Sequence, residues 1–109
     1  DIHIIGDSQG TGQPKAGHIA NAEAKICADA IIRSFNGQQP YANPKTNSAC
    51  YSPITSDTAS WLTAVFAYDA SSGTMKLIPE SFGAAEEPTG EYYEDMFEWA
   101  GNLFADTFG

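Results

Sequence analysis

The sequence predicts an α+β fold, in which one strand and a long helix precede a small antiparallel sheet and a closing helix. A β-branched run at residues 2–5 is followed by a polar loop and a stretch with helical periodicity. Three strand-like runs separated by turn residues come next, and a second helix-periodic stretch ends the chain. A connector at 36–46 containing prolines marks the expected boundary between a part at 1–38 and a part at 39–109.

The first part is typical of a parallel α/β unit. Residues 2–5 predict a buried strand that leaves its sheet through Gly6 and Asp7. A helix is predicted from about residue 16 to residue 35, and its apolar face is formed by Ala20, Ala24, Cys27, Ile31 and Phe35. Because one strand and one helix cannot close a sheet by themselves, we expect the other strands to lie elsewhere in a longer parent protein.

The second part predicts an antiparallel meander and a helix. The expected strands are residues 49–55, 60–68 and 74–79, with a hairpin loop at 69–73 and Pro53 at an edge. A helix at 90–106 begins after the candidate N-cap Thr89. Its expected apolar stripe consists of Tyr93, Met96, Phe97, Ala100, Leu103 and Phe104.

The charge balance restricts the possible partners. Fourteen acidic residues against five basic ones give a net charge of −9, which argues against binding to nucleic acid or to an anionic membrane surface. After Lys76 the chain has no basic residue, so one end of the molecule is strongly negative. This acidity indicates a solvated surface and permits a basic protein partner. The sequence shows neither a zinc-ligand pattern nor a nucleophile-elbow motif.

One constellation predicts a ligand site. A strand that ends in Gly6 and Asp7 places a carboxylate at the carboxyl end of a sheet, where open α/β sheets bind ligands. The helix that starts after Lys15 directs free backbone amides toward an electron-rich acceptor. Considered alone, this short motif favours a simple turn aspartate over a ligand-binding carboxylate.

The order of four segments resembles the flavin-binding subunit of flavocytochrome c sulfide dehydrogenase. They read IHIIGD, QPKAG followed by IANAEAK, NSACYS, and the terminal FADTFG. This resemblance implies that Gly6 and Asp7 lie at the ribityl chain of FAD, with Asp7 as hydrogen-bond acceptor. It also implies that Ala16, Gly17 and His18 face the flavin pyrimidine oxygen and that Lys15 adds positive charge there.

The resemblance also gives roles to two further residues, Cys50 and Trp99. Cys50 is similar to one half of a redox-active disulfide over the flavin, whose partner cysteine comes from an earlier part of the chain. Trp99 matches a tryptophan near the flavin. His18 departs from the family pattern, in which tyrosine is more familiar, and is expected to be a tolerated substitution. Cys27 and His3 are expected to be structural.

The resemblance implies a C-terminal piece of a periplasmic flavoenzyme. Such an enzyme oxidises sulfide and passes electrons through FAD to a cytochrome c subunit. The glycine-rich nucleotide-binding fingerprint is absent from these 109 residues, so we expect the isolated chain to bind FAD weakly, to be inactive and to self-associate. Two alternatives stay open: a piece of a sulfide:quinone reductase or another disulfide reductase, and a non-catalytic acidic interaction domain.

Overall fold

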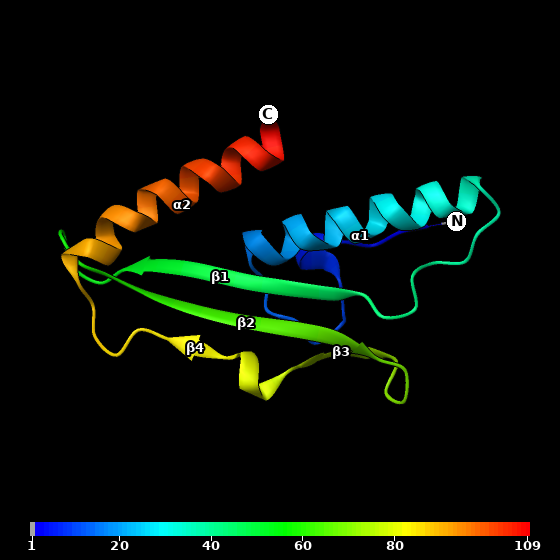
Figure 1. Ribbon diagram of the computed structural model, residues 1–109, viewed down its shortest axis with the longest axis horizontal. Helices are drawn as coiled ribbons and strands as arrows, with labels where there is room; N and C mark the ends of the chain where they lie inside the picture. Colours follow the sequence, from blue (N-terminus) through cyan, green and yellow to red (C-terminus); the bar gives the residue numbers. More distant parts are fainter. Residues whose placement is uncertain (1) are drawn as a thin grey trace.

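The structure is a computed structural model that describes residues 2–109. A four-stranded antiparallel sheet has the order β1-β2-β3, and β4 pairs with β2. Figure 1 shows both long helices on the β1 side of this sheet. The elements are η1 (Gly6–Ser8), α1 (Gly17–Phe35), β1 (Lys45–Pro53), β2 (Ala59–Asp69), β3 (Thr74–Leu77), η2 (Pro79–Ser81), β4 (Gly83–Ala84) and α2 (Gly90–Phe108). The predicted α+β class is confirmed.

The core lies where the start of α1 crosses the sheet. Ile19 of α1 is 1% exposed and packs with Ala64 and Phe66 of β2 and Met75 of β3. These apolar side chains all lie on one face of the sheet, because side chains alternate along a strand and Phe66 and Met75 follow the same pleat across the β2–β3 register. The docking of α1 on the sheet therefore depends on a small group of buried residues.

The helix α2 begins against the opposite face. Strand alternation directs Tyr51 and Trp61 away from α1, and their rings contact Trp99 and Tyr92 of α2 at centroid distances of 5.7 Å and 6.1 Å. Thr89 caps this helix as predicted, because its hydroxyl accepts the Tyr92 N–H at 3.1 Å. The two helices thus cover different faces and approach each other beyond the β1 edge (Figure 1).

The predicted hairpin between β2 and β3 is present. The Gly73 N–H donates to the Asp69 carbonyl, and Gly73 has a φ of +68°, which a residue with a Cβ adopts only with strain. The Pro53 prediction is also confirmed, because β1 is an edge strand and Pro53 is its last residue. Strand β1 begins four residues earlier than expected, at Lys45 rather than Ala49.

The predicted strand at residues 2–5 is wrong. The segment has no regular secondary structure, and Ile2, Ile4 and Ile5 are exposed. A strand requires a neighbour for its backbone hydrogen bonds, and none of the described strands lies beside this segment. The chain instead enters a single 3₁₀ turn at Gly6.

The apolar faces predicted for the two helices are only partly those that pack. In α1 the buried residues are Ile19 and Glu23, whereas Phe35 of the predicted face is 87% exposed. In α2 the predicted Phe97 and Phe104 are exposed, and Trp99 and Tyr92 make the contacts with the sheet. Periodicity identified each helix, but most of the face that it indicated in α1 is exposed, whereas four of the six residues that it indicated in α2 are half-buried. The division at residue 38 stays a prediction.

Candidate functional site

The start of α1 presents backbone amides that have no hydrogen-bond acceptor among residues 2–109. Ala16 is extended, with φ −145° and ψ 148°, and no side chain of residues 2–109 caps the helix. The first intrahelical bond runs from the Ala20 N–H to the Ala16 carbonyl. The amides of Gly17 and His18 therefore have no acceptor within the helix, and this positive end favours an electron-rich group.

His18 connects this helix start to strand β1. Its Nδ1 accepts the Ala49 N–H at 2.7 Å, across 31 positions of the chain. Burial lowers the pKa of the His18 imidazole below its ordinary value, and nearby Lys25 lowers it further, while Asp106 opposes them. The imidazole is therefore neutral at neutral pH, and Ala49 is the residue before Cys50.

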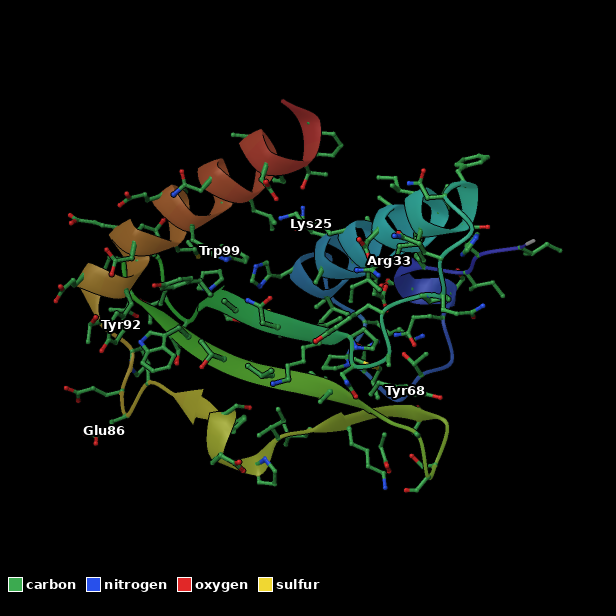
Figure 2. The ribbon with its side chains drawn as sticks, turned by 45° about the vertical axis from the view of Figure 1, so that its right-hand side comes forward. Lys25, Arg33, Tyr68, Glu86, Tyr92 and Trp99 are labelled. Carbon is green, nitrogen blue, oxygen red and sulfur yellow. The ribbon has the colours of Figure 1, made fainter. Side chains whose placement is uncertain are left out.

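Cys50 and Trp99 line one groove between β1, β2 and α2. Its cavity volume is about 400 Å³, and its other walls include Tyr51, Trp61 and Glu98. The thiol of Cys50 is half-buried and lies 3.4 Å from the Ser48 hydroxyl. Figure 2 shows Trp99 pointing from α2 toward the sheet. The two residues predicted to be catalytic thus line the same groove, although strand alternation directs the side chains of Cys50 and Tyr51 to opposite faces of the sheet.

Acidic and aromatic side chains line much of this groove. Asp95 and Glu98 of α2 line it. Burial raises the pKa of the Tyr51 hydroxyl, and the negative charge of Asp95 raises it further. The Trp99 Nε1–H is buried and has no hydrogen-bond acceptor among residues 2–109. An unpaired buried donor is costly unless a ligand accepts from it.

A second, smaller cavity joins Trp99 to His18. Its volume is about 200 Å³, and Lys25 and Asp106 also line it. These two charges form an ion pair of 2.7 Å, and Figure 2 shows Lys25 extending from α1 toward α2. The three predicted site residues His18, Cys50 and Trp99 therefore lie in adjoining cavities at the β1 edge.

The other predicted ligand residues lie outside these cavities. Gly6 has a φ of +72°, and its N–H donates to the Glu23 carboxylate at 2.7 Å. Asp7 is exposed on η1, and the ammonium of Lys15 donates to the Gln9 carbonyl. Neither Gly6, Asp7 nor Lys15 lines the Cys50 groove. Their predicted contacts with FAD stay predictions.

Sequence reasoning missed a buried polar network behind the helix start. Glu23 is 8% exposed, and its two oxygens accept from the Gly6 N–H and from Gln13 Nε2 at 2.7 Å and 3.1 Å. Gln13 in turn accepts from the Thr46 hydroxyl of β1. The only signal in the sequence was Glu23 four residues after Ile19, which helical geometry places on the same face.

The residues at the β1 edge fit one side of a flavin. A planar ring system with polar edges requires apolar walls and access, and the groove offers aromatic side chains and an open mouth. The buried Trp99 Nε1–H, which has no acceptor among residues 2–109, is a further donor of the same residue. The unpaired amides at Gly17 and His18 add donors nearby. For the phosphates, these 109 residues offer no glycine-rich fingerprint.

A comparison with known families agrees with this fit. The model of the family described as flavocytochrome c sulphide dehydrogenase, flavin-binding, matches residues 42–108, which is more than half of the chain. The chain belongs to this family of flavoprotein oxidoreductases. The match includes Cys50 and Trp99, whereas residues 6–18 lie outside it. The resemblance read from the sequence is confirmed, and with it a redox role as part of a flavoprotein.

Among residues 2–109, neither helix is both long and apolar enough to cross a membrane.

Proposed function

We propose that this chain supplies the Cys50 and Trp99 side of the flavin site in a sulfide dehydrogenase that delivers electrons to a cytochrome c subunit. The observation that carries this proposal is the shared groove of Cys50 and Trp99, within the segment that matches the family. The acceptor follows from the family's name, and a periplasmic location is part of the same proposal.

In this proposal the chain's own residues have separate tasks. Cys50 forms a disulfide with a cysteine outside these residues, since Cys27 and Cys50 are both free thiols here and line different cavities. Hydrosulfide attacks one sulfur of that disulfide, which forms a persulfide on one cysteine and releases the other as a thiolate. Trp99 forms an aromatic wall and donates through Nε1.

The residues around the start of α1 bind and orient the flavin in this proposal. FAD, when bound, supplies the two-electron acceptor. The amides of Gly17 and His18, which follow the extended Ala16, direct donors toward its negative edge, and Lys15 adds positive charge. Asp7, exposed and held next to the positive-φ Gly6, is available to accept from ribityl hydroxyls.

The test compares two cysteine variants of the flavin-loaded protein. Under anaerobic conditions, sulfide should bleach the flavin absorbance of the native protein. We expect that sulfide does not bleach the flavin of Cys50→Ser, whereas dithionite still does. Cys27→Ser is the matched control, because Cys27 lies on α1 outside the groove. Bleaching by sulfide within about twofold of normal in Cys50→Ser would contradict the proposed role, because without Cys50 there is no disulfide for hydrosulfide to attack.

The electron acceptor is tested separately. In stopped-flow mixing, the sulfide-reduced protein is expected to reduce its cytochrome c subunit faster than it reduces a soluble quinone. The reverse preference would favour the alternative of a sulfide:quinone reductase.

A further inference from the structure

The hydrogen bond between His18 and Ala49 closes an otherwise open sheet edge. Strand β1 is an edge strand, and the Ala49 N–H points away from β2 because it donates to His18 Nδ1 at 2.7 Å. The imidazole thus takes the place that the carbonyl of a neighbouring strand would occupy. A side chain on the first turn of α1 thereby fixes the backbone directly before Cys50.

This bond requires one particular proton state. An imidazole nitrogen that accepts a hydrogen bond carries no proton, so His18 must be the neutral form protonated at Nε2. Protonation of the ring places a proton on Nδ1, facing the Ala49 N–H. Two donors cannot bond to each other, so the contact is lost when His18 becomes charged.

The charged groups around His18 determine the pH at which the imidazole becomes protonated. From α1 the facing charge is Lys25, and from α2 it is Asp106. From β1 the adjacent titratable group is the Cys50 thiol. Burial and Lys25 lower the pKa of His18 and outweigh Asp106. The contact is therefore complete at neutral pH and is lost as the pH falls from the ordinary histidine value through the lowered value of the folded state.

We infer that His18 is a positioning residue that holds the Cys50 strand against the start of α1 and releases it on protonation. This makes the exposure of Cys50 dependent on pH. The consequence for sulfide chemistry rests on the proposed function, whereas the contact and its release do not.

Two substitutions separate the hydrogen bond from the charge. His18→Asn places Oδ1 close to where Nδ1 lies, so it keeps an acceptor for Ala49 but does not titrate. His18→Phe keeps a ring and removes the acceptor at every pH. His3→Asn is the matched control, because His3 is the only other histidine of the chain and lies in the exposed segment 2–5.

The first measurement is the ¹⁵N spectrum of the His18 ring in the full protein. We expect a neutral ring with the proton on Nε2 and a titration midpoint below the ordinary histidine value. The Ala49 amide signal should shift with the same midpoint. A ring protonated at Nδ1 at neutral pH would overturn the inference.

The second measurement is the rate at which iodoacetamide alkylates Cys50 in the reduced protein, divided by the rate at Cys27 in the same sample. Dividing the Cys50/Cys27 rate ratio of the native protein by that of His18→Asn cancels the common effect of pH on the thiols. We expect this quotient to be near one at neutral pH. Below the His18 midpoint it should rise about fivefold, as the loss of one typical hydrogen bond implies. His18→Phe should show the raised rate throughout, and His3→Asn should follow the native profile.

A flat ratio across the titration of His18 would overturn the inference even if Cys50→Ser abolishes reduction by sulfide. Conversely, a rising ratio together with normal sulfide reduction in Cys50→Ser would disprove the proposed function alone. The two ideas can therefore fail separately.

Discussion

Truncation of Ile19 tests whether a single side chain docks α1 on the sheet. Ile19 is the largest fully buried side chain among residues 2–109 and contacts the β2–β3 face through Phe66 and Met75. Ile19→Val removes one methylene and should cost about 1 kcal/mol, whereas Ile19→Ala should cost roughly 2–3 kcal/mol. We take the lower part of the usual range because the small, open core allows neighbouring side chains to relax into the cavity.

The assay is urea unfolding of the series, followed by tryptophan fluorescence and by circular dichroism. With a slope near 2 kcal/mol per molar urea, which is typical of a small domain, Ile19→Ala should lower the midpoint by about 1–1.5 M. Ile32→Ala is the matched control on the same helix, because Ile32 is 60% exposed. Its cost should stay within about 0.5 kcal/mol.

Equal midpoints for Ile19→Ala and Ile32→Ala would refute the reasoning, because they would mean that Ile19 does not hold the helix. If fluorescence and circular dichroism gave different midpoints, α1 would undock before the sheet unfolds. In that case the cost would have to be assigned to undocking alone.

Four further predictions follow from individual contacts. Glu23→Gln should destabilise the protein by about 1–3 kcal/mol in urea titrations, because both partners of the carboxylate are donors and an amide would oppose one of them with its own N–H; an unchanged midpoint would contradict this network. Thr89→Ala should cost about 1 kcal/mol through the lost helix cap, and Thr89→Ser should restore most of it. The Lys76 ammonium holds the pKa of Asp69 far below its usual range, so the hairpin contact should be present above the ordinary aspartate pKa and weaken only in strong acid, as followed by the amide shifts of the loop; Asp69→Asn should remove this acid dependence. The isolated chain should self-associate in light scattering because apolar side chains such as Phe104 are exposed, and a monomer at high concentration would contradict this.

The parts of the fold that local rules govern could be predicted. The 69–73 turn, the Thr89 cap and the two helices each depend on residues a few positions apart, and all are present. The strand at residues 2–5 failed because its β-branched composition describes a preference, whereas strand pairing needs a neighbour distant in sequence. The two-residue strand β4 was missed because it is too short to show a pattern.

Some residues of the candidate site could be predicted, but their arrangement in space could not. Cys50 and Trp99 could be proposed only through a family resemblance, and the structure places them in one groove although they are 49 positions apart (50 to 99). Asp7 and Lys15 could be proposed by the same route, yet the structure leaves them outside that groove. Spacing along the chain cannot give such a result, because the distance between two loops depends on how the elements between them pack.

His18 shows why a residue that departs from a family pattern is difficult to interpret from sequence. From sequence alone, a histidine beside a helix start indicates little, because no residue near it in the chain is an evident partner for its ring. Its meaning comes from the Ala49 amide, which lies 31 positions away and is left without a strand partner by the sheet order. An edge strand must place its outward amides on water or on a side chain, and only an acceptor serves. Position 18 therefore requires a hydrogen-bond acceptor that reaches the place of Nδ1. For this reason we expect asparagine to preserve the bond from the Ala49 N–H and phenylalanine to lose it.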